Sequence, residues 1–203
     1  MRRFVLIGQT ALASGDFSVD DLPSSSGRLD VLLRAVRAAL LVSHGLRRDV
    51  QVYLVLRGGS EGPRTLRIDG QSAKFLRPDE RSLATLVKKT LGAALSVSDT
   101  FTELRPGLEL RAGDLTELLH EVGQTPCFVL HEQGTDIREQ AFASDDAWYF
   151  FGDHLGFDVV SLALLEHRGY PRIAVGPVSL HTDDVVALVS NELDRRFSPR
   201  GGA

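Results

Sequence analysis

Three stretches of the chain share one pattern: CFVLHEQG at residues 127–134, WYFFGDHLG at 148–156 and IAVGPVSLH at 173–181. Each begins with a compact apolar run, typical of a buried strand, and continues into a short loop that contains glycine. In α/β proteins, ligands bind where the carboxyl ends of parallel strands meet at one edge of the sheet. The three stretches therefore predict a parallel sheet in the C-terminal half, with one ligand-binding crevice formed by the loops that follow its strands.

The composition is typical of a globular protein. The chain has 203 residues, and 43% of them are hydrophobic, which is enough apolar surface for one core. No apolar run approaches the roughly 18 residues that a membrane span needs, and the run after Met1-Arg2-Arg3 is too short for a signal peptide. We therefore expect one domain with no membrane partner, located in the cytoplasm, with a frayed tail at Ser198–Ala203.

The charge and the cysteine content restrict the function further. A net charge of -4 argues against a histone-like coat on nucleic acid, which needs clustered lysine and arginine. A local face of arginine can still bind a folded RNA through its phosphates. Cys127 is the single cysteine, so no intrachain disulfide can form, and its position inside an apolar run indicates a buried packing residue.

Hydrophobic periodicity predicts strands and helices along the rest of the chain. Further strands are predicted at 4–7, 50–56 and 65–68. Helices are predicted from Arg28 to Gly45, from about Pro78, and at 114–122, 159–167 and 183–196, with one long loop at 9–27 and an ambiguous stretch at 96–113. This order predicts an α/β fold in which a mostly parallel sheet is covered by helices on both faces.

The first predicted helix has a polar face as well as an apolar stripe. Asp30, Arg34 and Arg37 fall on this polar face. We expect them to form an i, i+4 ion pair on a solvated surface.

Three histidines, His131, His154 and His181, lie in the three predicted loops. Together with Glu132 and Asp153 they could hold zinc, but no HxxH or HExxH spacing is present, so every ligand would have to come from a separate loop. We favour the interpretation in which each imidazole hydrogen-bonds to backbone at a loop corner. No metal is expected.

Motifs for phosphate-bearing cofactors are absent from the sequence. There is no GxGxxG and no Walker A motif, and the glycine segment at 152–156 lies late in the chain. The loops agree better with a cofactor that is held by backbone groups and carries no phosphates. Adenosyl cofactors of methyl transfer are of this kind.

Several longer motifs resemble one known family. They are DFSVDDLP at 16–23, GRLDVLLR at 27–34, RPDERS at 77–82, LHE at 130–132, GDH at 152–154, GP at 176–177 and LH at 180–181. On these collinear motifs, which run from the first strand to the last helix, the chain is similar to the archaeal tRNA (pseudouridine-N1)-methyltransferase family and its bacterial relatives.

The resemblance implies a fold of the SPOUT class. It implies a C-terminal trefoil knot, a homodimer, and a single domain over 1–203 with an RNA-facing part at about 1–125 and a knotted, cofactor-binding part at about 126–197. The last helix would begin near Thr182, which is suited to cap it, and would pack on the partner subunit. Some relatives carry a cysteine at this helix start, where this chain has His181-Thr182-Asp183-Asp184.

The resemblance also implies a cofactor, S-adenosylmethionine, held mostly through backbone groups. The residues implied to contact it are Leu130, Gly152, Val175, Gly176, Pro177, Val178, Ser179 and Leu180.

The implied reaction is methyl transfer to N1 of a pseudouridine in RNA, by family analogy position 54 in the T-loop of tRNA. N1 is a free N–H and becomes a good nucleophile once a carboxylate or imidazole accepts its proton. The candidate acceptors are Asp16, Asp20, Asp30 and Asp153. Asp16 and Asp30 are favoured because both lie in matched motifs on the arginine-rich N-terminal side.

RNA contacts are expected from arginine. Arg28, Arg34 and Arg81 are the candidates for binding phosphate, with surface ion pairing as the alternative. Two other functions stay open: an RNA-binding module that kept the fold without the chemistry, and a metal-dependent hydrolase that uses the loop histidines.

Overall fold

The computed structural model describes residues 1–93 and 98–198. Its strands are β1 (Arg2–Leu12), β2 (Leu41–Val42), β3 (Gly45–Leu46), β4 (Val50–Gly58), β5 (Arg64–Asp69), β6 (Thr102–Arg105), β7 (Leu108–Ala112), β8 (Cys127–Asp136), β9 (Ala147–Gly152) and β10 (Arg172–Ala174). Its helices are α1 (Leu22–Ser25), α2 (Leu29–Leu40), α3 (Glu80–Ala93), α4 (Leu115–Leu119), α5 (Val159–His167) and α6 (Thr182–Phe197). The tail predicted to fray lies outside the described residues from position 199 onward, as do positions 96 and 97 of the ambiguous stretch.

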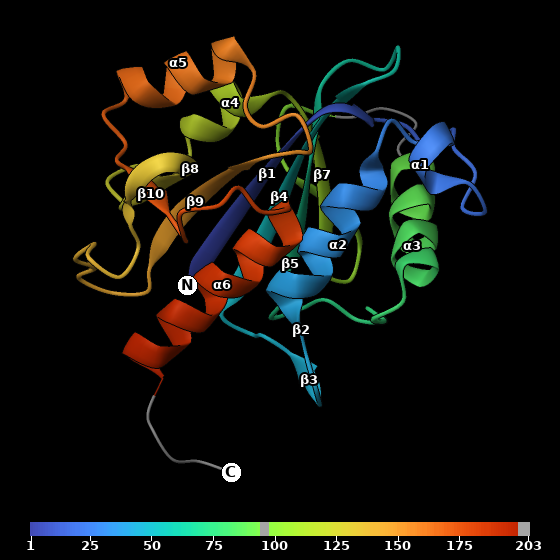
Figure 1. Ribbon diagram of the computed structural model, residues 1–203. Helices are drawn as coiled ribbons and strands as arrows, with labels where there is room; N and C mark the ends of the chain where they lie inside the picture. The colour runs from blue at the N-terminus through green and yellow to red at the C-terminus, as the bar shows by residue number, and fades with distance from the viewer. Residues whose placement is uncertain (94–97, 199–203) are drawn as a thin grey trace.

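One eight-stranded sheet organises the chain, in the order β10-β8-β9-β1-β4-β5-β7-β6 (Figure 1). The first five of these strands are parallel to one another, and β5, β7 and β6 join through antiparallel pairs. The predicted α/β class with a mostly parallel sheet is therefore confirmed. Strand β1 lies between β9 and β4, so strands from both predicted parts of the chain join the same sheet.

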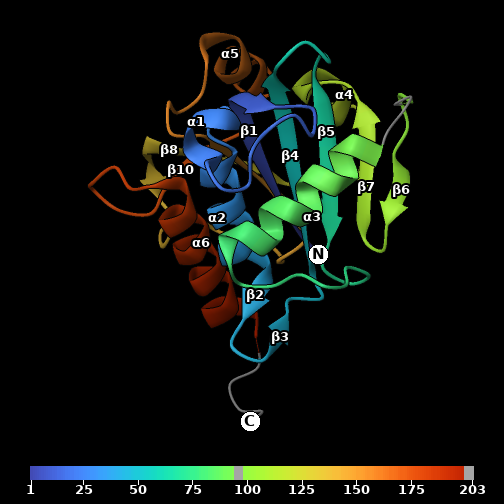
Figure 2. The same cartoon turned by 90° about the vertical axis from the view of Figure 1, so that its right-hand side faces the viewer.

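Alternate side chains of β1 enter two separate cores. Phe4 and Leu6 pack in the core under α2, α3 and α6, while Val5 and Ile7 pack in the core under α4 and α5. Figure 2 shows the first set of helices lying over one face of the sheet. A strand that is buried on both faces needs apolar residues at consecutive positions, which explains the uninterrupted run at the start of the sequence.

Several predicted boundaries are wrong for identifiable reasons. The first helix ends at Leu40 and not at Gly45, because Leu41 and Val42 pair with Leu46 and Gly45 in a short hairpin. The predicted loop at 9–27 is shorter, since β1 continues to Leu12 and α1 forms within it. The described part of the ambiguous stretch forms the β6–β7 hairpin. Helix α5 has the predicted bounds.

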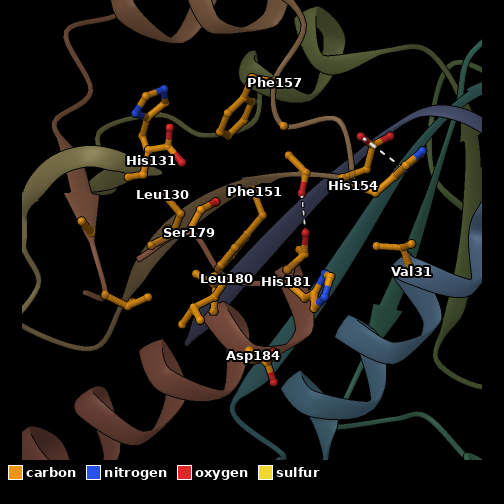
Figure 3. A pocket seen from close by; sticks show the side chains of 18 of the residues that line it. Val31, Leu130, His131, Phe151, His154, Phe157, Ser179, Leu180, His181 and Asp184 are labelled. Carbon is orange, nitrogen blue, oxygen red and sulfur yellow. Dashed lines mark hydrogen bonds and ion pairs between the residues drawn. The ribbon is translucent and has the colours of Figure 1, made fainter. Parts of the chain in front are cut away.

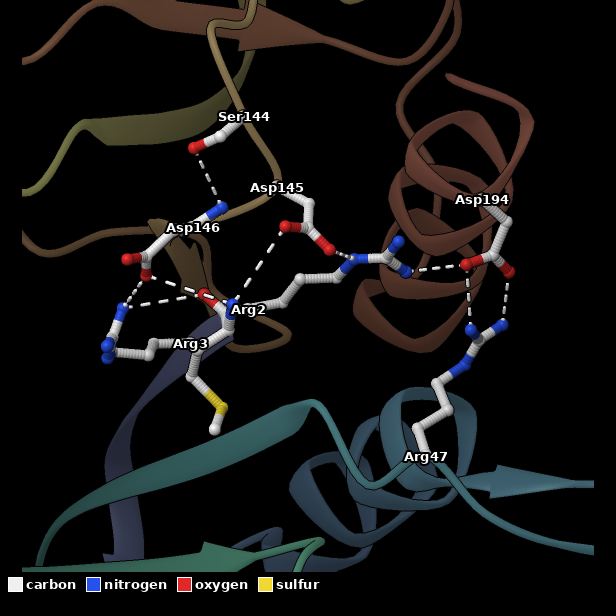
Figure 4. Close-up of polar contacts among 8 residues, drawn as sticks. Arg2, Arg3, Arg47, Ser144, Asp145, Asp146 and Asp194 are labelled. Atoms are coloured by element: carbon white, nitrogen blue, oxygen red, sulfur yellow. Dashed lines mark hydrogen bonds and ion pairs between the residues drawn. The ribbon is translucent and has the colours of Figure 1, made fainter. Parts of the chain in front are cut away.

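A partly buried ion pair connects the last helix to the first strand. Arg2 at the start of β1 is almost fully buried and donates to Asp194 near the end of α6 (Figure 4). Asp194 also accepts from both terminal nitrogens of Arg47, which follows β3. No helix in the described ranges has the length and apolar character needed to cross a membrane.

Candidate functional site

The three stretches that open the sequence analysis do meet, around a cleft of about 800 Å³. Residues 130–132 of β8, the segment from Phe151 to Phe157 and the segment from Ile173 to Thr182 line it (Figure 3). Residues 127–130 form a strand, as predicted. Residues 131–134, predicted as a loop, are also part of β8, which continues to Asp136 because β10 pairs with its far end at Thr135 and Asp136. The cleft lies at the carboxyl edge of the parallel strands, as the sequence predicts.

The residues expected to contact the cofactor are brought together in this cleft. All of them line it except Pro177. Leu130 and Phe151 supply an apolar wall, and the backbone from Val175 to Leu180 borders the opposite side. At Gly176 a side chain would meet no atom within 4 Å, so this glycine leaves space open in the cleft.

Gly152 begins a tight turn at the end of β9, in which the backbone folds back on itself at Gly156. A Cβ here would lie 2.2 Å from the carbonyl carbon of Gly156, so no other residue can occupy the position without displacing backbone. The carbonyl oxygen of Gly152 accepts a hydrogen bond from Thr182 Oγ1 at 3.0 Å. The predicted capping by Thr182 is wrong: His181 occupies the N-cap position of α6, and the Thr182 hydroxyl binds β9 instead.

Asp153, one of the candidate proton acceptors, is buried and holds the loop in place. Its carboxylate accepts from the backbone N–H of Gln9 at 2.8 Å, from that of Leu155 at 2.9 Å, and from the Gln9 side chain at 3.3 Å. These bonds join the β9–α5 loop to the end of β1. The carboxylate is therefore engaged in positioning the cleft wall.

The histidines line the cleft but do not converge. Figure 3 shows the imidazoles of His131, His154 and His181 pointing in different directions. In the described part of the chain no group of three His, Cys, Asp or Glu side chains is placed to hold a metal ion.

One histidine makes the predicted bond to backbone, although it lies in strand β8 and not at a loop corner. His131 Nδ1 accepts from the Gln133 backbone N–H at 3.2 Å, and burial, with the neighbouring Arg172, lowers the pKa of His131. His154 Nδ1 instead lies 3.8 Å from the Asp153 carboxylate.

The prediction that Asp30 forms an ion pair on a solvated surface is wrong. Only 2% of this residue is exposed. Arg28 donates to both of its oxygens, at 3.0 and 3.2 Å, and Arg34 donates at 3.0 Å. Burial alone would raise the pKa of Asp30, but the hydrogen bonds from the two arginines outweigh it and hold this pKa below its ordinary value. A buried carboxylate with a lowered pKa and occupied oxygens is a poor proton acceptor.

The same contacts fix the side chains of the two arginines. Arg34 lines the cleft, and Arg28 takes up a left-handed conformation with φ of 67° at the start of α2. Such a conformation is costly for a residue with a side chain and is found where surrounding structure holds it. Arg34 also lies 3.6 Å from Glu80 and 3.9 Å from Asp183.

The remaining N-terminal candidates lie outside the cleft. Asp16 is exposed, bonds with Ser14 and lines a second hollow. Arg81 and Asp20 form an exposed ion pair with each other. Neither Asp16 nor Asp30, the favoured proton acceptors, lines the cleft, because the β1–α2 connection carries Asp16 away and Asp30 turns inward.

Two carboxylates that do line the cleft were not proposed as proton acceptors. Glu132 on β8 and Asp184 in the first turn of α6 are both exposed, and neither takes part in a hydrogen bond or ion pair with any residue of 1–93 or 98–198. In the sequence, Asp184 is marked only by its position in the first turn of a helix. An acidic residue there is equally explained by its favourable interaction with the helix dipole.

Known proteins similar to this chain agree with the site. A tRNA (pseudouridine(54)-N(1))-methyltransferase from Methanococcoides burtonii is 40% identical over 200 residues, 98% of each chain. The protein of the same name from Methanosarcina acetivorans is 41% identical over 99% of this chain and 94% of its own length.

Solved structures show the same fold. Archaeoglobus fulgidus Nep1 bound to S-adenosylhomocysteine is 15% identical but superposes with a TM-score of 0.64 over 95% of this chain and 97% of its own. A family model described as "Putative SAM-dependent RNA methyltransferase" matches residues 1–197. The chain is therefore a member of this family of S-adenosylmethionine-dependent RNA methyltransferases, as its motifs indicate.

Proposed function

We propose that the protein transfers a methyl group from S-adenosylmethionine to N1 of pseudouridine 54 in tRNA. One observation carries the proposal: three segments of the C-terminal half border a single cleft, in a chain about 40% identical, over nearly its whole length, to proteins named for this reaction. The substrate position is taken from the names of these relatives.

The cleft suits S-adenosylmethionine by its shape and lining. Its volume of about 800 Å³ lies in the range of small-molecule sites, and its walls combine apolar side chains with exposed backbone. Leu130 and Phe151 would contact the adenosyl group, and the backbone of Val175–Leu180 would bind its polar edges. Gly176 leaves room that a side chain would fill.

The protein's own contribution to the reaction is alignment and proton acceptance. S-adenosylmethionine, when bound, supplies an activated methyl group, so the chain has to hold the attacking nitrogen in line with it, which is worth several kcal/mol of barrier. In place of Asp16 and Asp30, Glu132 and Asp184 are the free carboxylates that the cleft offers to accept the N1 proton.

Arg28 and Arg34 are proposed to bind a phosphate of the target nucleotide. Their side chains are about 40% exposed while Asp30 fixes their other edge. A guanidinium that is oriented before binding loses less entropy when it meets a phosphate. Arg81 could contribute only by exchanging its partner Asp20 for RNA.

We further propose that the chain forms a homodimer as one domain. Leu155, Val178 and Leu180 at the cleft and Leu188 on α6 are exposed apolar residues, and a second copy of the chain would cover them. Light scattering of the purified protein tests this: a mass of one chain, 22.2 kDa, would contradict it.

A trefoil knot formed by the cleft segments completes the proposal. Its support is that segments distant in the sequence pack closely here: β10 pairs with the far end of β8, where a Cβ at Gly134 would lie 2.5 Å from the backbone nitrogen of Ile173, and Thr182 bonds to Gly152. An experimental structure with continuous density from Leu130 to Thr182 tests the threading.

The decisive experiment is methyl transfer in vitro. Purified protein is incubated with labelled S-adenosylmethionine and two tRNA transcripts, one carrying pseudouridine at position 54 and one carrying uridine. We expect N1-methylpseudouridine only from the first, identified by mass spectrometry of the nucleosides. Binding of the pseudouridine tRNA without methyl transfer would instead support the RNA-binding module.

A further inference from the structure

A second hollow lies on the N-terminal part of the molecule. It has a volume of about 620 Å³ and is formed by the loop after β1, the turn between β4 and β5, the last turns of α3, and β6. The loop is held tightly against α3, since a Cβ at Gly15 would lie 2.8 Å from the carbonyl oxygen of Lys88. The hollow is therefore built from packed backbone.

The hollow is positive although the chain as a whole is negative. Four basic side chains line it, against the two acidic side chains of Asp16 and Glu61; the basic ones are Arg64, Lys88, Lys89 and Arg105. A net charge of -4 over the whole chain makes this a local concentration. Such a site attracts anions.

Two of the four cations are already used within the protein. Arg64 donates to the carbonyl of Ala13 at 3.0 Å and to Glu61 at 2.7 Å, and Lys88 donates to the carbonyl of Phe17. These bonds fix the walls of the hollow.

The other two cations are available to a ligand. Lys89 is exposed, and neither Lys89 nor Arg105 makes a hydrogen bond or ion pair with the part of the chain that the structure describes. Arg105 Nε is buried with no partner there.

The hollow opens at the same edge of the sheet as the cleft. Its loop follows the carboxyl end of β1, and Glu61 and Arg64 follow the carboxyl end of β4, which is parallel to β1. The start of α2, with Arg28 and Arg34, follows the same loop. Basic side chains are therefore present at two places along this edge: Arg28 and Arg34 at the start of α2, and Lys89 and Arg105 at the hollow.

We propose that this hollow binds the sugar-phosphate backbone of the RNA substrate, away from the target base. Lys89 and Arg105 bind consecutive phosphates, and the exposed carboxylate of Asp16 accepts a hydrogen bond from a ribose 2′-hydroxyl. Asp16 does not line the cleft, so we assign it a role in RNA binding and not in catalysis. A contact with the 2′-hydroxyl distinguishes RNA from DNA. The inference rests on the proposed RNA methyltransferase function.

The test removes both free cations and compares the result with a matched control. The variant K89Q/R105Q is set beside K74Q/R77Q, which removes the same charge from exposed residues 74 and 77 that line neither hollow. For each protein, tRNA affinity is measured over a range of salt concentrations, together with the tRNA KM and the affinity for S-adenosylhomocysteine.

We expect K89Q/R105Q to raise the tRNA KM about tenfold and to lower the slope of log K against log salt by about 2, as for two lost phosphate contacts. The control and the S-adenosylhomocysteine affinity should not change. The exposed single variant K89Q, which carries no risk to folding, should give about half of the slope change. In competition assays, D16A should lose preference for RNA over DNA of the same sequence, and D16N should retain part of it.

Failure of the inference is distinguishable from failure of the proposed function. If the wild type does not methylate pseudouridine tRNA, the proposed function fails. If the wild type methylates and K89Q/R105Q matches the control in KM and salt slope, the inference is overturned. It is also overturned if the variant loses binding of inorganic phosphate alone while tRNA binding is unchanged.

Discussion

Arg2 and Asp194, which are 192 positions apart in the chain, form a hydrogen-bonded ion pair with a nitrogen–oxygen distance of 2.5 Å. The Arg2 side chain is 2% exposed and that of Asp194 is 29% exposed. The pair joins the amino end of the central strand to the last turns of α6, and Arg47 adds a bidentate contact to Asp194 at 2.6 and 2.8 Å.

The first prediction is that Asp194→Ala strongly destabilises the protein. It leaves the buried guanidinium of Arg2 without its closest partner, at a cost of about 3 kcal/mol. Urea unfolding measures this. The control Asp146→Ala breaks the exposed pair with Arg3 and should cost less than about 1 kcal/mol; equal effects for the two variants would contradict the argument.

The second prediction concerns acid. Burial would raise the pKa of Asp194, but hydrogen bonds from Arg47 and Arg2 outweigh it, so the folded-state pKa lies below 3.8, the ordinary value. The unfolded chain then binds more protons as the pH falls towards and below 3.8, and the free energy of unfolding decreases over that range. The pKa of Asp30 is also lowered in the folded protein, so this residue contributes to the same loss of stability in acid.

This loss of stability in acid is tested by measuring the free energy of unfolding from neutral pH down to the acid range. Asp194→Asn should be less stable at neutral pH and should show a shallower loss in acid than the wild type. A variant with an unchanged acid slope would show that the pair does not control this dependence.

The third prediction is that Gly176→Val weakens S-adenosylmethionine binding without unfolding the protein. The new side chain meets no protein atom at Cβ and so occupies cleft volume. We expect the affinity in calorimetry to fall about tenfold, or roughly 1.4 kcal/mol. Gly45→Val, in the β2–β3 hairpin and also in open space, is the control; a wild-type affinity for Gly176→Val would place the cofactor elsewhere.

The fourth prediction separates the two free carboxylates of the cleft. Loss of the proton acceptor should slow methyl transfer about 10²-fold, with unchanged affinity for S-adenosylhomocysteine. Single-turnover rates of Glu132→Gln and Asp184→Asn identify which residue acts, and the affected variant should also lose the acidic limb of the pH–rate profile. Glu139→Gln, outside the cleft, is the control. If both cleft variants keep the wild-type rate, neither residue is the acceptor.

The fifth prediction is that Cys127 is inert in the folded protein. Burial raises the pKa of this thiol to about 11, so little thiolate exists at neutral pH. Mass spectrometry after iodoacetamide treatment should find no alkylation of the native protein and complete alkylation in concentrated urea. Rapid labelling of the native protein would show that the thiol is accessible.

The sequence predicts best where a local pattern has one structural solution. Val159–His167 forms a helix with the predicted bounds, and the carboxyl-edge rule correctly brings Leu130, Gly152 and Val175 to one cleft. Cys127 is buried, as its apolar run predicts. These features depend on periodicity and on chain direction in a parallel sheet, both of which are visible in the sequence.

Features that depend on tertiary partners could not be predicted in the same way. His131-Glu132-Gln133-Gly134 has a polar, loop-like composition, yet it is strand because β10 pairs beyond it. Asp30 has the spacing of a surface ion pair with Arg34, yet Arg28 and the surrounding fold bury it. In both cases a distant segment decides the structure.

The position of β1 at the centre of the sheet has a consequence for biosynthesis. The ribosome releases β1 first and its partner β4 soon after, but β9, which pairs with its other edge, is released only when about three quarters of the chain has been made. Until then the open edge of a strand with the apolar run Phe4–Ile7 is available to pair with other chains. We therefore expect the nascent chain to depend on chaperone protection of Phe4–Ile7 until synthesis has passed Gly152.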